Sequence, residues 1–242
     1  YPPAEAVWQA AFHAVSAFNS AGFTMLPDSS SLSGFQTDRA VLGIIGTLIF
    51  LGAISYWVML DVVRLRRFSL LTLNTKLVLV FMGALTLLGG LVFMLSEYNN
   101  QSTLGELSIG DKAIVSIFES ISGRTAGFTT VSYGETEQHT NFFFTSLMFT
   151  GGAAGSVAGG IKVNTLAVVL VALLATIRGR ARANAFGREI PQAQVHLAMT
   201  LGAVAIAYVF LAALLLTFAE TGFTFIDPLS GPVPAAGTVG LS

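Results

Sequence analysis

Three long apolar stretches restrict this chain to a helical fold inside a membrane. The stretches 40–60, 77–96 and 197–219 hold 21, 20 and 23 residues without a charged side chain. An α-helix rises 1.5 Å per residue, so about 20 residues cross the ~30 Å hydrocarbon layer of a bilayer. Only 10% of the residues are charged, against roughly 25% in soluble domains, and the mean hydropathy is +0.73. The chain is therefore predicted to be an all-α polytopic membrane protein that contacts the lipid bilayer.

The composition argues against several other classes of protein. A net charge of −1 without a basic stripe gives no sign of a nucleic-acid partner. No cysteine is present, and His13, His139 and His196 stand apart, so neither a disulfide framework nor a histidine metal site is expected. No nucleophile and base pair suggests an enzyme. Because the chain begins with Tyr1, we expect it to be a fragment of a longer protein.

A fourth apolar segment, 142–177, is too long for one straight span and is interrupted by glycine. Five of the ten residues from 151 to 160 are glycines, each costing a helix roughly 1 kcal/mol relative to alanine. We expect two half-helices, 142–150 and 163–177, joined by a loop inside the membrane. Non-helical backbone is tolerated at that depth only where it lines water or is buried in protein. The loop is therefore expected beside a permeation path.

Two shorter apolar segments, 6–18 and 114–123, have the length of re-entrant helices. If the second only dips into the membrane, two spans separate the arginines at 64–67 from those at 178–188, and both groups face the cytoplasm. Were it to cross, they would face opposite sides. The positive-inside rule favours the dip.

A short polar motif follows both re-entrant segments and recurs at the end of the chain. The three copies are Ser20-Ala21-Gly22, Thr125-Ala126-Gly127 and Thr238-Val239-Gly240. Backbone carbonyls of such a segment can replace the hydration shell of an alkali cation, and glycine supplies the backbone angles that residues with a Cβ adopt poorly. The motif predicts a selectivity filter that binds an alkali cation at carbonyl oxygens only. Ordinary Ser/Gly-rich turns are the simpler explanation, which three equivalent copies make less favoured.

Three side chains close to the motif are predicted to support the filter: Asn19, Glu119 and Arg124. A cation facing the axis would repel the transported ion. Arg124 is therefore expected to point behind the filter and to donate hydrogen bonds to carbonyls or to Glu119. A purely structural brace is the favoured reading of this arginine.

The glycine-rich loop holds a second group of candidate site residues. Its candidate residues are Gly151, Gly152, Gly155, Ser156, Gly159, Gly160 and Lys162. Lys162 is expected to hold the loop by bonding to carbonyls, the alternative being a lysine that extends to the cytoplasm. A phosphate-binding P-loop is excluded because no Lys-Ser/Thr pair follows the glycines and no strand precedes them.

These motifs resemble those of the Trk/Ktr/HKT potassium transporter superfamily, over nearly the whole chain. The resemblance implies four pseudo-fourfold repeats of outer helix, re-entrant pore loop and inner helix around a central ion pore. Residues 1–67 would be the second repeat without its outer helix, 68–188 the complete third repeat, and 189–242 the fourth repeat without its inner helix. Pro232 and Pro234 depart from the family pattern, since proline disrupts a helix and the fourth pore helix should lie there.

The resemblance further implies potassium uptake through the filter, gated by the loop, in a bacterial cell membrane. No covalently bound cofactor is implied, and sodium is an alternative transported ion. The expected partners are a second pore subunit in a homodimer and a cytoplasmic nucleotide-binding regulatory subunit of the RCK type. A secondary transporter of a small organic solute, with a discontinuous helix at its binding site, is the alternative function.

Overall fold

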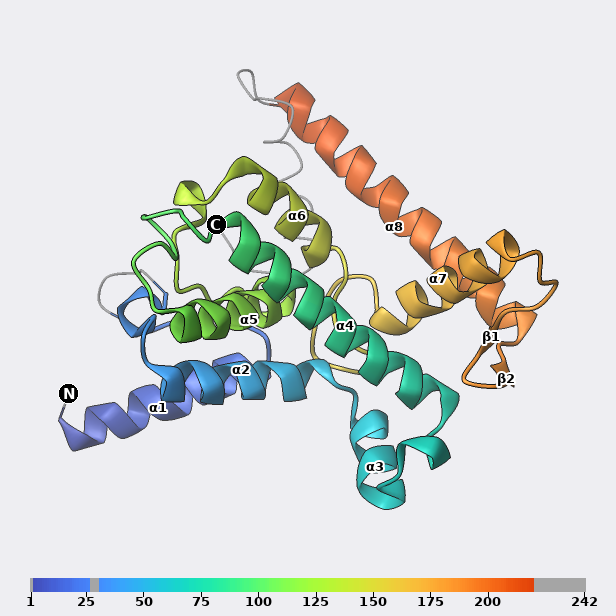
Figure 1. Cartoon of the computed structure of the whole chain (residues 1–242), viewed down its shortest axis with the longest axis horizontal. Helices are drawn as coiled ribbons and strands as arrows, with labels where there is room; N and C mark the ends of the chain where they lie inside the picture. The colour runs from blue at the N-terminus through green and yellow to red at the C-terminus, as the bar shows by residue number, and fades with distance from the viewer. Residues whose placement is uncertain (1, 27–30, 220–242) are drawn as a thin grey trace.

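The computed structural model describes residues 2–26 and 31–219 as an assembly of helices with one two-stranded hairpin (Figure 1). The α-helices are α1 (Pro3–Phe18), α2 (Arg39–Ala53), α3 (Tyr56–Leu65), α4 (Leu73–Ser96), α5 (Ile109–Thr125), α6 (Gln138–Met148), α7 (Val163–Ile177) and α8 (Gln192–Ala219). Three 3-10 turns lie between them: η1 (Ser33–Phe35), η2 (Phe68–Leu70) and η3 (Tyr133–Glu135). The hairpin is β1 (Asn184–Ala185) paired with β2 (Arg188–Glu189).

Most predicted elements are present. The short helices α1 and α5 cover the two predicted re-entrant segments, and α4 and α8 cover two of the predicted spans. Helices α6 and α7 are the two predicted half-helices, separated by the glycine-rich loop. Among the described residues, α4 and α8 are each long and apolar enough to cross a membrane.

The stretch 40–60, predicted as one transmembrane helix, is not a continuous helix, although its two halves together are long and apolar enough to form one broken span. The segment forms two helices, α2 and α3, whose axes differ by 99°. Ile54 between them is extended, with φ −88° and ψ 137°, and the Ser55 hydroxyl accepts a hydrogen bond from the Val58 N–H to begin α3. A serine at the N-cap, just before a new helix, accepts from a backbone N–H that has no partner within the helix, and this stabilises the start of α3.

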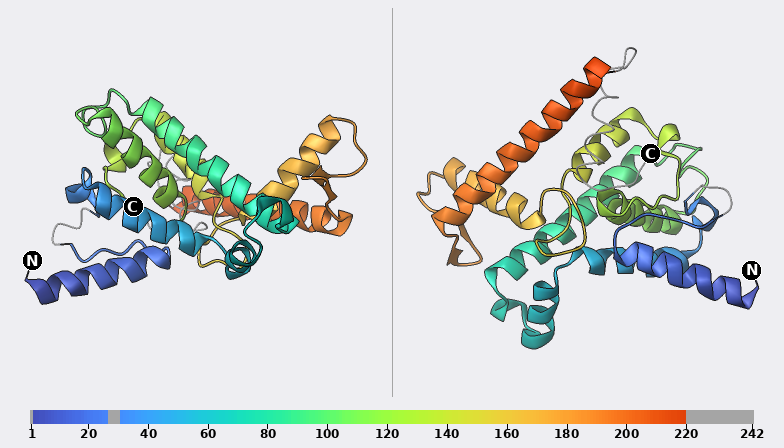
Figure 2. Two further views of the ribbon diagram at one scale, coloured as in Figure 1. Left: turned by 60° about the horizontal axis from the view of Figure 1, so that its bottom comes forward. Right: turned by 180° about the vertical axis from the view of Figure 1, so that it is seen from behind.

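Helix α5 lies in the middle of the described fold, between α2 and α4 (Figures 1 and 2). Two glycines of α4 make the close approach possible. A Cβ on Gly89 would lie 2.3 Å from the Ser120 hydroxyl oxygen, and one on Gly90 would lie 2.7 Å from the Ile117 side chain. Aromatic side chains then fill the core around α5, with Phe118 and Phe128 almost fully buried.

Helix α8 is held differently, because it packs against α7 and extends away from the rest (Figure 2). Only 11% of its apolar 18-residue window is buried, against 39% for α4. Most of its apolar surface therefore faces the surroundings of the described chain.

The two arginine-rich segments lie together at one end of the molecule. The rings of Phe68 and Phe186, which belong to these segments, stack edge to face with centroids 5.9 Å apart. The two segments predicted to face the same side of the membrane thus lie next to each other. The β1–β2 hairpin that carries Phe186 at its turn was not predicted.

Candidate ion-conducting site

Two of the three motif copies converge in space. Gly22 follows α1 and lies directly against the backbone that follows α5. A Cβ on Gly22 would lie 2.3 Å from the carbonyl oxygen of Ala126 and 3.5 Å from the carbonyl carbon of Gly127. Real Cβ contacts are essentially never below 3.0 Å, so only glycine fits here. Segments 105 residues apart thus meet at their glycines.

Both glycines have the left-handed backbone that the motif predicts. Gly22 has φ +73° and Gly127 has φ +85°. A side chain would strain either position, so the sequence requirement for glycine is conformational at both and also steric at Gly22.

The two copies are stabilised by the same pair of interactions. A serine near the end of each re-entrant helix donates to the carbonyl of the phenylalanine that follows the glycine. Ser16 donates to the Phe23 carbonyl at 2.9 Å, and Ser122 donates to the Phe128 carbonyl at 2.6 Å. Each hydroxyl thereby fixes the chain as it leaves the motif.

The second interaction uses different side chains in the two copies. The carboxylate of Glu119 accepts hydrogen bonds from the Thr130 N–H and hydroxyl, both at 2.7 Å, and from the Tyr133 hydroxyl at 3.1 Å. In the first copy His13 Nε2 accepts the N–H of Met25 at 3.4 Å, while its Nδ1 lies 2.7 Å from the Gln9 carbonyl. Thr130 and Met25 each lie three residues after their glycine. The predicted bracing position of Glu119 is thus matched by a histidine that was not predicted.

The first copy is one residue longer between its bracing serine and its glycine. Six positions separate Ser16 from Gly22, and five separate Ser122 from Gly127. Ser20 takes up the extra residue in a left-handed turn with φ +52°, and its buried hydroxyl has no partner among the described residues.

The other two predicted support residues lie differently from expectation. The Asn19 amide is exposed and donates to the Val15 carbonyl, at the end of its own helix. Arg124 is only 1% exposed, but its guanidinium has no hydrogen-bond partner among the described residues, so the expected bond to Glu119 is absent. The oxygens of Glu119 are instead occupied by Thr130 and Tyr133. The third motif copy, Thr238-Val239-Gly240, and the segment with Pro232 and Pro234 lie outside the described residues.

The glycine-rich loop binds to the break between α2 and α3. The N–H of Ala153 donates to the Ala53 carbonyl at 2.8 Å, and that of Val157 donates to the Gly52 carbonyl at 3.4 Å. Carbonyls at the end of a helix lack an intrahelical partner, so the break supplies acceptors to the loop. A Cβ on Gly52 would also lie 1.8 Å from the Phe18 carbonyl oxygen at the end of α1. Gly52, which accepts a hydrogen bond from the loop, therefore also contacts the last residue of α1.

The loop closes on itself through its glycines. The N–H of Gly151 donates to the Ile161 carbonyl at 2.9 Å, and a Cβ on Gly151 would lie 1.5 Å from the Gly159 carbonyl oxygen. The Lys162 ammonium donates to the Ala158 carbonyl, as predicted for a residue that holds the loop. Gly155 and Gly160 are left-handed, with φ +80° and +72°. Gly152 is buried, and Ser156 has a buried hydroxyl without a described partner.

One asparagine ties the tip of the loop to two helices. Asn164, in the first turn of α7, accepts the Ala154 N–H at 2.8 Å and donates to the side-chain oxygen of Asn74 in α4. Nothing in the sequence marks Asn164, because its partners are ten and ninety residues away.

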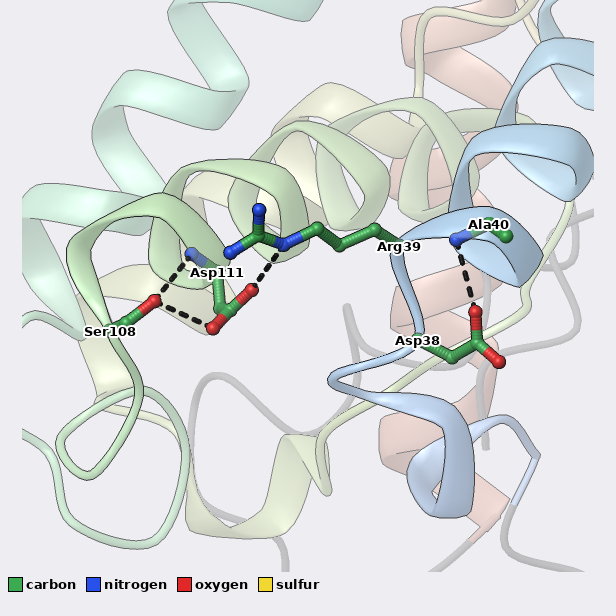
Figure 3. A network of polar contacts seen from close by, with 5 residues as sticks. All are labelled: Asp38, Arg39, Ala40, Ser108 and Asp111. Atoms are coloured by element: carbon green, nitrogen blue, oxygen red, sulfur yellow. Dashed lines mark hydrogen bonds and ion pairs between the residues drawn. The ribbon is translucent and has the colours of Figure 1, made fainter.

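At the first turns of α2 and α5, polar contacts join the two helices (Figure 3). The Arg39 guanidinium donates to the Asp111 carboxylate at 2.8 Å, and the Ser108 hydroxyl donates to the same carboxylate at 2.6 Å. The hydrogen bond from Ser108, followed by that from Arg39, holds the pKa of Asp111 below its ordinary value. Asp38 begins α2 by accepting from the Ala40 N–H. These contacts fix the starts of the two helices to each other.

Comparison with known proteins assigns this arrangement to a family. The model of the TrkH family, described as cation transport protein, matches residues 4–242. The chain belongs to the TrkH family. It is 36% identical to the Ktr system potassium uptake protein B of Bacillus subtilis over 96% of this chain and 51% of that protein. It is 35% identical to the potassium/sodium uptake protein NtpJ of Enterococcus hirae over 99% and 53%.

The fold is also that of a solved family member. The crystal structure of the potassium transporter TrkH from Vibrio parahaemolyticus superposes with a TM-score of 0.74, at 21% identity, over 96% of this chain and 50% of that one. The chain spans about half the length of the relatives it matches. Membership of the TrkH family, together with the apolar helices α4 and α8, identifies it as a helical, multi-pass membrane protein.

Proposed function

We propose that the protein containing this chain takes up potassium through a path lined by backbone carbonyls of the TrkH-type motifs. The contact between Gly22 and the Ala126 carbonyl carries this proposal, because it brings two filter segments of different repeats together. Residues 20–22 and 125–127 supply two sides of the path; 238–240, a further candidate by sequence, lie outside the described residues. The remaining side comes from outside this chain. The names of the relatives support potassium, and that of NtpJ keeps sodium as a second cation.

The glycine-rich loop is proposed to be the gate. Its support is its attachment to Gly52 and Ala53, since Gly52 also touches the end of α1 just before the filter. Release of the loop from these carbonyls would open the path without unfolding either half-helix. Lys162 and Asn164 would set how firmly the closed loop is held.

Arg124 is proposed to brace the filter through an acceptor outside the described residues. Its burial supports this, because a guanidinium buried without a partner costs several kcal/mol. The division into second, third and fourth repeats, the homodimer, the RCK-type subunit and the bacterial cell membrane remain predictions of the resemblance.

Rubidium flux into vesicles that contain the full-length protein tests this function. We expect rubidium entry to be competed by potassium and not by amino acids or sugars. Gly127→Ala should abolish the flux, whereas Gly43→Ala, where nothing lies within 4 Å of the new Cβ, should preserve it. Entry of an organic solute without entry of an alkali cation would refute the proposal in favour of a solute transporter.

A further inference from the structure

The ion path leaves one strongly charged surface unused, formed by residues 61–72 and 178–192. We call it the basic patch. It contains seven of the twelve basic residues of the chain against two carboxylates, a net charge of +5. All seven are exposed arginines: Arg64, Arg66, Arg67, Arg178, Arg180, Arg182 and Arg188. Only Arg182 forms an ion pair with a described residue, Glu189 at 3.0 Å, so most of the positive charge is available to a ligand.

The basic patch is held together by contacts within and between its two segments. Edge-to-face stacking of Phe68 on Phe186 joins the segments, although the two rings remain 49% and 45% exposed. The Thr72 N–H and hydroxyl donate to the Asp61 carboxylate at 3.0 and 2.9 Å, and fix the turn between α3 and α4. The arginines are therefore mounted on a formed surface with apolar side chains between them.

The basic patch lies where helices that can cross the membrane begin and end. Helix α4 begins five residues after Phe68, α7 ends directly before Arg178, and α8 begins four residues after Arg188 (Figure 1). Guanidinium groups so close to the ends of apolar helices lie at the depth of lipid headgroups.

Helix α3 gives this surface an apolar edge. It turns by 99° from α2, so the two helices cannot both run along the membrane normal. Tyr56 and Trp57 at its start are 66% and 71% exposed, and Val63 is 65% exposed. Exposed tyrosine and tryptophan beside arginines are typical of a helix lying in the membrane interface.

From these observations we infer that the basic patch binds anionic phospholipid headgroups, with Phe68, Phe186 and α3 inserted among the upper acyl chains. Guanidinium groups form paired hydrogen bonds with phosphate oxygens, and Arg66, Arg67 and Arg188 are free of ion pairs among the described residues to do so. A soluble protein partner is less favoured, because exposed aromatic side chains beside the ends of apolar helices are typical of a membrane interface.

Thermal unfolding of the purified full-length protein tests this inference, with phosphatidylglycerol or phosphatidylcholine added to the detergent. We expect phosphatidylglycerol alone to raise the melting temperature, and added salt to reduce the rise. Each arginine near an anionic surface contributes about fivefold in affinity. Arg66→Gln, Arg67→Gln and Arg188→Gln combined should thus require roughly 100-fold more phosphatidylglycerol for the same rise.

Two controls separate charge from fold. Lysines at the same three positions should retain most of the response, and Arg39→Gln, at the far end of α2, should retain all of it. An equal response of wild type and triple glutamine variant would overturn the inference. So would a response to both lipids alike. Loss of binding to a cytoplasmic protein in the triple variant, with an unchanged lipid response, would assign the basic patch to that partner instead. The readout is thermal unfolding and not rubidium flux, so failure of this inference can be told apart from failure of the proposed ion path.

Discussion

Gly22 lies so close to Ala126 that a single added carbon atom would come within 2.3 Å of the Ala126 carbonyl oxygen. The two residues follow different helices, α1 and α5, so their contact fixes the distance between the two segments proposed to line the ion path.

Gly22→Ala should therefore displace the Ala126 carbonyl and weaken ion selectivity. We expect the ratio of potassium to sodium flux to fall by about tenfold, which corresponds to roughly 1.4 kcal/mol. Gly179→Ala is the matched control, because Gly179 also has a positive φ, +65°, but has nothing within 4 Å. Equal ratios in wild type and Gly22→Ala would show that this contact does not set selectivity.

Glu119 should stabilise the protein through its acceptor atoms. Glu119→Leu leaves the Thr130 N–H, the Thr130 hydroxyl and the Tyr133 hydroxyl without their acceptor, at roughly 1–3 kcal/mol each. We expect the melting temperature to fall by about 10 °C. Glu119→Gln keeps one acceptor oxygen and should lose less than half as much.

Glu106→Gln, at an exposed carboxylate, serves as the control for Glu119 and should melt like wild type. If Glu119→Leu melted no lower than Glu119→Gln, the bracing role would be contradicted.

Asn164→Ala should loosen the glycine-rich loop, because it removes the acceptor of the Ala154 N–H and the donor to Asn74. We expect resting rubidium flux to increase several-fold, as one or two hydrogen bonds of about 1 kcal/mol each are lost. Asn164→Asp keeps the acceptor and should be intermediate. Asn99→Ala, at an exposed asparagine, should leave the flux unchanged. A resting flux in Asn164→Ala no higher than in wild type would rule out this latch.

Asp111 should make stability depend on acid pH. Since hydrogen bonds from Ser108 and Arg39 lower its folded pKa, the carboxylate stabilises the fold above its ordinary pKa of about 4. This contribution is lost as the pH falls through the lowered folded pKa. Wild type should melt slightly higher than Asp111→Asn at pH 7, and the two melting temperatures should converge as the pH falls from about 4 through the lowered folded pKa. A constant difference across this range would argue against the assignment.

Hydropathy and glycine spacing were sufficient to predict α4, α8 and the two half-helices, because these elements depend on local composition. The break between α2 and α3 was not predictable in the same way. No proline marks Ile54, and the Ala53 carbonyl is satisfied by Ala153, a hundred residues later in the chain. Long-range partners of this kind leave no local pattern.

The left-handed glycines of the proposed filter could be picked out from their recurrence, but the serines that brace these segments were missed although a signal existed. Phe12 and Phe118 each stand four residues before a bracing serine. The residue directly after each phenylalanine is the other bracing residue, His13 or Glu119. The two copies of this pattern are 106 residues apart, whereas the glycines are 105 apart. When the two copies are aligned on their glycines, the phenylalanines and serines are out of register by one residue, so the shared pattern is not seen. Arg124 differs again, since its position in the sequence indicated burial but not which acceptor it meets.

The break after Ala53 has a consequence for how members of this family can diverge. The Gly52 and Ala53 carbonyls accept hydrogen bonds from a loop about a hundred residues later in the chain, and Gly52 also makes room for the end of α1. In a chimera that exchanges only the glycine-rich loop between relatives, the new loop would meet a break between α2 and α3 that fits a different loop. The loop and the break between α2 and α3 should therefore be exchanged together. Substitutions in one are expected to be tolerated only with matching substitutions in the other.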